Sequence, residues 1–161
     1  MTRIAASYTF QEVENKVKPA LNEFLRNDIQ LLEIAAHEQA MTHRIASYLQ
    51  KYFPDWQVDC EYNKIVTEKK ELNGKEIRPD IIIHRRMSNI SDDNLLCVEA
   101  KKIDKPIDDA QRKLHGLTDL NGTYKYRFGL LLIIGLDTPF SVTGHWYHDG
   151  ELERPFELAL T

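Results

Sequence analysis

The sequence predicts an α/β fold with a mixed central sheet flanked by helices and an extra helix at the N-terminus. Apolar residues recur at helical spacing in residues 10–53 and again after residue 106. Between and after these segments lie alternating or continuous apolar runs, which are typical of strands. The order is therefore helix, three strands, helix, strand, and this order implies helices packed against one sheet.

The first helix is predicted to begin after Thr9, which stands three residues before Glu12 in the spacing of a capping box. Apolar residues then follow at intervals of three and four. Pro19 lies inside this pattern and predicts a kink or a division of the helix. A second helical pattern runs from about residue 29 to residue 53 and stops before Pro54.

Three strands are predicted next, at about residues 57–63, 78–86 and 94–101. Asn73-Gly74 favours a tight turn in the polar segment before the second of them. Pro106 is typical of the first turn of a helix. The apolar run within 127–136 predicts a strand covered on both faces, and residues 142–148 predict an additional edge strand.

The length of 161 residues, with 42% hydrophobic and 29% charged residues, fits one domain with a hydrophobic core. Within it we expect an N-terminal helical extension (1–33), a core (34–136), and a C-terminal edge strand and tail (137–161). Cys60 and Cys97 lie far apart in predicted strands, which favours reduced core thiols over a disulfide or a zinc site.

Composition limits the partners and the location. No apolar run approaches the roughly 20 residues of a membrane span, and the N-terminus lacks the order of a signal peptide. We therefore expect a cytoplasmic protein that does not bind membranes. The net charge of −4 argues against non-specific coating of nucleic acid. Lys and Arg are nevertheless concentrated in residues 64–127, which indicates either a local attraction for a polyanion or a salt-bridged surface.

The chemistry of the sequence is concentrated in two runs, Arg78-Pro79-Asp80-Ile81-Ile82-Ile83-His84 and Leu95-Leu96-Cys97-Val98-Glu99-Ala100-Lys101-Lys102. Side chains alternate across a strand, so Glu99 and Lys101 share one face. If the two runs form a hairpin, Asp80 comes beside both. Two carboxylates and one ammonium at the edge of a sheet can hold a divalent metal.

With this order of elements, the chain resembles the PD-(D/E)xK nuclease superfamily over roughly residues 34–136, with Asp80, Glu99 and Lys101 at its three motif positions. The resemblance implies a restriction-endonuclease-like αβββαβ core and cleavage of DNA. It also implies Mg²⁺, for which Mn²⁺ substitutes, bound by Asp80, Glu99 and the backbone carbonyl of Ala100. Such a metal would position a phosphodiester, lower the pKa of a water molecule and stabilise developing charge, while Lys101 would orient the attacking water.

Glu38 is the next candidate, because it places a carboxylate on an otherwise apolar helical stripe. In the resemblance it matches an acidic residue of the first core helix that completes the metal site. The alternative is a Glu paired with a nearby Lys or Arg.

Other candidates are substrate contacts, each with a solvated surface residue as its alternative. These are His84 on the strand parity of Asp80, Gln111 and Lys113 on the following helix, and Arg78 and Lys102 beside the motif, with Arg85 and Arg86 as further phosphate contacts. His145 and His148 would form a metal pair only on a helix, and their segment is predicted to be a strand.

These observations predict a Mg²⁺-dependent phosphodiesterase acting on DNA, with an endonuclease favoured over an exonuclease. The small size is compatible with a homodimer that cuts both strands. Two alternatives remain at this stage: a catalytically inactive nuclease-like module that binds nucleic acid or protein, and a structural domain in which the three motif residues form an ion-pair network.

Overall fold

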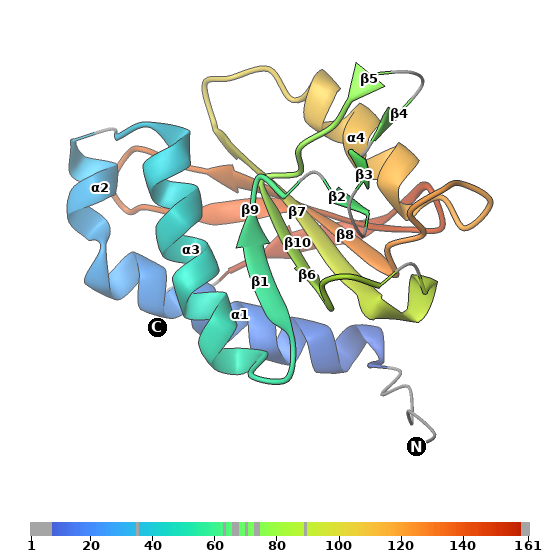
Figure 1. Ribbon diagram of the computed structural model, residues 1–161. Helices are drawn as coiled ribbons and strands as arrows, with labels where there is room; N and C mark the ends of the chain where they lie inside the picture. Colours follow the sequence, from blue (N-terminus) through green and yellow to red (C-terminus); the bar gives the residue numbers. More distant parts are fainter. Residues whose placement is uncertain are drawn as a thin grey trace.

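The computed structural model describes residues 8–34, 36–62, 64–65, 68–69, 71–72, 75–88 and 90–158. A six-stranded mixed sheet forms the centre, with helices on both faces (Figure 1). The fold is thus α/β, as the sequence predicts. The predicted turn at Asn73-Gly74 lies outside the described residues.

Three helices precede the sheet: α1 (Phe10–Asn27), α2 (Ile29–Glu33) and α3 (Glu38–Tyr52). Thr9 caps α1, since its hydroxyl accepts a hydrogen bond from the Glu12 N–H at 3.2 Å. Pro19 lies within α1 without dividing it. The predicted continuous helix over 29–53 is wrong, because α2 ends at Glu33 and α3 begins at Glu38. Both helices bury apolar residues in one core, Leu32 from α2 and Met41 from α3.

The sheet contains β1 (Gln57–Cys60), β6 (Ile81–His84), β7 (Asn94–Lys102), β8 (Phe128–Ile134), β9 (Val142–His148) and β10 (Glu151–Glu157), in that spatial order. Only β7 and β8 are parallel; the other neighbouring pairs are antiparallel. Helix α4 (Asp108–Thr118) connects β7 to β8, as a parallel pair requires. The C-terminal segment supplies two strands, so β10 and not β9 forms the edge.

Smaller elements lie outside this sheet. Strands β2 (Lys64–Ile65) and β3 (Glu68–Lys69) pair with each other, as do β4 (Glu71–Leu72) and β5 (Lys75–Glu76). A short 3₁₀ helix, η1 (Ser91–Asp93), precedes β7.

The two faces of the sheet have separate cores. On one face α1 and α3 pack on side chains that include Ile81, Ile83 and Val98. On the other face α4 packs on Ile82 and Cys97, which alternate with the first set. A carboxylate at position 99 therefore lies on the α4 face, among apolar side chains. This placement positions the candidate site.

Within the described part of the chain, no helix has both the length and the apolar character needed to cross a membrane. The two cysteines, both described, form no disulfide; Cys97 is buried and Cys60 half-buried.

Gly144 in β9 provides a test of the sheet. A Cβ at this position would overlap the backbone carbonyl oxygen of Leu131 in β8. We expect Gly144→Ala to force β8 and β9 apart and to lower the free energy of unfolding by about 2 kcal/mol. Urea unfolding at equilibrium measures this, with the neighbouring exposed Thr143→Ala as the control. Equal midpoints for the two variants would contradict the strand pairing.

Candidate functional site

Asp80 and Glu99 meet at the end of the β6–β7 pair. Asp80 directly precedes β6, and Ile81 lies opposite Val98, so that Asp80 comes opposite Glu99. The Ala100 N–H donates a hydrogen bond to Asp80 Oδ2 at 2.9 Å, and the Asp80 N–H donates to Glu99 Oε1 at 3.4 Å. The structure therefore brings together two of the three motif residues.

Glu99 is fully buried, and its Oε2 atom accepts no hydrogen bond from any described residue. Burial raises the pKa of Glu99 well above its ordinary value, and the negative charge of Asp80 raises it further. The Lys113 ammonium lies 3.8 Å from Oε2 and offsets part of this effect. A buried carboxyl with an unsatisfied oxygen is costly for a fold to maintain.

Lys101 and Glu38 form a second pair beside the first. The Lys101 ammonium lies 3.7 Å from Glu38 Oε1, while Glu38 Oε2 accepts a hydrogen bond from the Lys102 N–H at 2.8 Å. Glu38 is the first residue of α3, where the helix dipole favours a carboxylate. The side chains of Lys101 and Glu38 are both about one-quarter exposed, at 26% and 29%. Glu38 therefore ties α3 to the end of β7.

A pocket of about 190 Å³ opens next to Asp80 on the α3 side. Besides Asp80 and Glu38 it is lined by Glu61, Cys60 and polar residues of α3. The pKa of the Cys60 thiol is raised to about 11, first by burial and then by the neighbouring carboxylates. Cys60 is therefore protonated at neutral pH and is not a nucleophile there.

Glu61 lines this pocket but was not among the site residues predicted from the sequence. Its N–H donates to the Asp80 carbonyl at 3.1 Å, and its carboxylate accepts a hydrogen bond from Gln39 at 3.2 Å. Glu61 follows β1 in the left-handed region, with φ of 50°. The signal was its position on the polar side of the predicted first strand, but only the antiparallel β1–β6 register places it opposite Asp80.

The carboxylates around Asp80 and Glu99 determine whether a divalent metal can bind at this site. Among the residues that the structure describes, no three Asp, Glu, His or Cys side chains gather closely enough to form a complete metal site. Mg²⁺, however, commonly takes only one or two protein carboxylates and keeps several waters. Asp80 and Glu99 fit this requirement. The Oε2 atom of Glu99 has no hydrogen-bond partner among the described residues and lies 3.8 Å from the Lys113 ammonium. The Ala100 carbonyl stays a predicted ligand.

The predicted substrate contacts are distributed around the site. Lys113 contacts Glu99, and Gln111 lies beside the Tyr147 hydroxyl. Arg78 is exposed and contacts Glu76 at 3.2 Å. The Lys102 backbone holds Glu38, as described above. The roles of these side chains toward a substrate stay predictions.

His84 lies at the far end of β6 from Asp80 and is buried. Its Nε2 atom is 2.7 Å from Asp59 Oδ2, and its ring centre lies 4.7 Å from that of Tyr62, with the two rings tilted by 60°. Arg86 binds the same Asp59 carboxylate through two guanidinium nitrogens. His84 thus contributes to a structural cluster about four strand residues, or roughly 13 Å, from Asp80.

Comparison with known proteins identified no matching family model, curated protein or solved structure.

The Asp59 cluster predicts a pH dependence of stability. Burial raises the pKa of Asp59, but hydrogen bonds from Arg86 and His84 outweigh it and hold the pKa below its ordinary value. A lowered pKa stabilises the fold at neutral pH, and this contribution is lost as the pH falls through the acid range. We expect Asp59→Asn to lower the free energy of unfolding at pH 7 by about 1 kcal/mol, because solvent partly screens the cluster.

Urea unfolding between pH 7 and pH 3 measures this effect, and the difference from the natural protein should shrink toward acid pH. Asp55→Asn, at an exposed turn, is the control. A difference that stays constant with pH would show that Asp59 is not held ionised by its neighbours.

Proposed function

We propose that the protein is a metal-dependent nuclease that hydrolyses phosphodiester bonds of DNA. The observation that carries this proposal is the contact between Asp80 and Glu99 on neighbouring strands, with a buried and unsatisfied Glu99 oxygen. Strongly perturbed carboxyl groups that meet beside a pocket are typical of functional sites. Such a buried pair lowers the free energy of unfolding, and nothing would compensate for this loss if the pair bound no ligand.

The order of elements supports a restriction-endonuclease-like core. When the short elements β2–β5 and η1 are set aside, helix α3, strands β1, β6 and β7, helix α4 and strand β8 follow the order αβββαβ, and their four strands are neighbours in the sheet. Helix α1 precedes this core, and β9 and β10 extend it. The motif residues lie at the beginning of the second strand of this core and at the end of the third.

Asp80 and Glu99 would hold the metal, and Glu38 would complete its surroundings from α3. Bound there, Mg²⁺ or Mn²⁺ would supply a Lewis acid for a phosphodiester oxygen and for the attacking water. The Ala100 N–H fixes one oxygen of Asp80, which leaves the other oxygen available. Asp80 therefore presents its carboxylate in a fixed direction toward Glu99.

Lys101 would orient the attacking water and neutralise charge that develops on the phosphate. In the structure its ammonium is held by Glu38, at the exposed edge of the site. Lys113 occupies the inner position next to Glu99. The two lysines thus approach the carboxylate pair from the end of β7 and from α4 respectively, and each has a separate electrostatic partner.

These two ion pairs also favour one alternative, a nuclease-like module without catalytic activity. In that alternative Lys113 and Lys101 permanently neutralise Glu99 and Glu38, and no metal enters. The two functions differ in whether a divalent cation can displace Lys113 from Glu99.

Incubation of the protein with supercoiled, linear and single-stranded DNA in Mn²⁺ tests the proposal. We expect nicking or cutting that Asp80→Asn, Glu99→Gln and Lys101→Ala each reduce by about 100-fold or more, because each removes a group that acts on the reacting atoms. Asp55→Asn should retain full activity. Cleavage that persists in all three variants would identify a contaminant, and absence of metal-dependent cleavage on every substrate would reject the enzyme.

Mn²⁺ binding, followed by electron paramagnetic resonance without DNA, tests the metal independently of activity. We expect Asp80→Asn to abolish binding. Lys113→Gln should tighten binding on the order of tenfold, because it removes a positive charge beside the incoming cation. Unchanged binding in Asp80→Asn would place the metal elsewhere, and absence of binding in the natural protein and in Lys113→Gln would favour the inactive module.

A further inference from the structure

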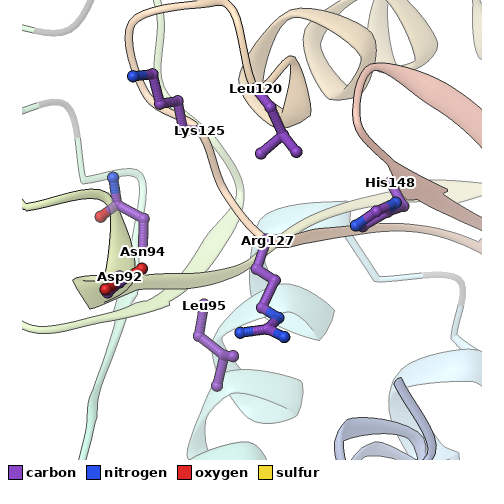
Figure 2. Close-up of a pocket in the computed structure, with 7 residues that line it drawn as sticks. All are labelled: Asp92, Asn94, Leu95, Leu120, Lys125, Arg127 and His148. Carbon is purple, nitrogen blue, oxygen red and sulfur yellow. The ribbon is translucent and has the colours of Figure 1, made fainter. Parts of the chain in front are cut away.

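Figure 2 shows a second polar pocket, of about 270 Å³. It lies near the end of β7 opposite to that of Glu99. Asn94 begins β7, Arg127 directly precedes β8, and His148 ends β9. Because β7 and β8 are parallel, their first residues share one edge of the sheet. Five strand residues separate Asn94 from Glu99, a distance of roughly 16 Å. The pocket is therefore distinct from the proposed nuclease site.

The pocket carries unpaired positive charge. Lys125 and Arg127 are both exposed, and neither has a carboxylate within ion-pair distance among the described residues. Several arginines elsewhere do have such a partner; Arg44 and Arg85, for example, lie 3.2 Å from Asp28 and Asp93 respectively. Among the described residues that line the pocket, Asp92 is the one acid. In Figure 2 Arg127 lies centrally, between Leu95 and His148, with Lys125 and Leu120 above it.

The backbone that carries the two cations is held in place. Tyr124 and Tyr126 are buried at 3% and 0% exposure, so the residues that alternate with them, Lys125 and Arg127, face solvent. Asn94 connects this segment to β7 through two hydrogen bonds. Its side-chain amide donates to the Tyr124 backbone carbonyl at 2.8 Å, and its backbone carbonyl accepts from the Arg127 N–H at 3.0 Å. The two charges are thus presented from a fixed frame, which reduces the entropy lost on binding a ligand.

Lys125 adopts a positive φ of 53°, a conformation that costs energy for a residue with a Cβ. Backbone strain of this kind is concentrated at binding sites. At Lys125 this strained backbone carries an ammonium that has no ion-pair partner within the described residues. Both features favour a ligand that supplies the missing negative charge.

An aromatic recess of about 170 Å³ adjoins the pocket, and His148 lines both. Phe10, Phe128 and Trp146 form its walls, and the Arg154 guanidinium lies 4.0 Å from the centre of the Phe10 ring. The His148 and Phe128 rings are 5.9 Å apart. Phe128 and Trp146 are buried, whereas His148 and Arg154 are exposed at the recess, and imidazole and guanidinium planes accept the flat face of a nucleobase.

We propose that this pocket binds the phosphate group of a nucleotide, with the base directed to the aromatic recess. Arg127 provides a planar fork that matches phosphate oxygens, and Lys125 adds a point charge. The phosphate belongs either to a free nucleotide or to a nucleic-acid strand, since both present the same chemistry. Binding here requires no metal and no hydrolysis, so the inference goes beyond the proposed nuclease activity.

The test is calorimetric titration in EDTA, which removes divalent metal from the carboxylate site. The probes are adenosine 5′-monophosphate, a single-stranded DNA ten-mer without a terminal phosphate, and inorganic phosphate. We expect the double variant Lys125→Gln/Arg127→Gln to weaken nucleotide or DNA binding by about tenfold or more at low salt. Asp92→Asn should tighten nucleotide or DNA binding, because this substitution removes a negative charge from the lining of the pocket.

Arg26→Gln/Lys51→Gln, which removes two positive charges from exposed positions on α1 and α3, is the matched control and should bind normally. Loss confined to the monophosphate identifies a free nucleotide as the source of the phosphate, and loss confined to the ten-mer identifies a strand. The proposal is overturned if no probe binds, if the pocket variant binds as well as the natural protein, or if the control pair loses as much. Asp80→Asn should bind normally, which separates this site from the nuclease.

Discussion

The structure depends on the burial of the Glu99 carboxyl beside Asp80. Alternation along β7 causes this placement. Leu96, Val98 and Ala100 face the core under α1 and α3, so Cys97 and Glu99 face α4, and the β6–β7 register brings Asp80 opposite Glu99. An unsatisfied buried carboxyl costs a few kcal/mol, and a like charge beside it adds to the cost. The apolar side chains of β6, β8 and α4 supply the compensating burial. A fold that maintains such a group against its own stability favours a role for it in binding or catalysis.

The arrangement of lysines follows from the same constraint. Two acids of the site each have an ammonium within 4 Å: Glu99 has Lys113 and Glu38 has Lys101. Without a divalent cation, these lysines offset part of the negative charge, which helps β7 to hold Glu99 in an apolar environment. A divalent cation at Asp80 and Glu99 would replace the effect of Lys113 with a larger charge. At the proposed metal site, the difference between the interaction energies of Lys113 and of a divalent cation with Glu99 would decide which of the two the site holds.

The sequence predicted the parts of this arrangement that depend on local periodicity. Alternation along β7 placed Glu99 and Lys101 on one face, and the capping box placed the start of α1. It could not predict the break between α2 and α3, because no proline or glycine marks it; the direction of α3 is set by packing on the sheet and by Glu38 bound to the Lys102 N–H. The contact of Lys113 with Glu99 and the position of Glu61 beside Asp80 also depend on tertiary packing, across α4 and across β1. Strand β10 was missed because only one of its residues, Phe156, is buried, so its pattern lacks alternation.

The distribution of charge along the sheet bears on the proposed binding of a polyanion by an acidic chain. The net charge is −4, yet the carboxylates of the proposed metal site and the two cations of the second pocket lie at opposite ends of the central strands. Carboxylates lie where β7 ends, and Lys125 and Arg127 lie where β8 begins. Screening at physiological salt acts over about 8 Å, which is less than the separation of the two ends. A phosphate at the basic end therefore interacts mainly with the cations beside it. At the acidic end the carboxylates would repel a phosphate until a divalent cation reversed the local charge, so the two proposed sites would attract phosphate by different means.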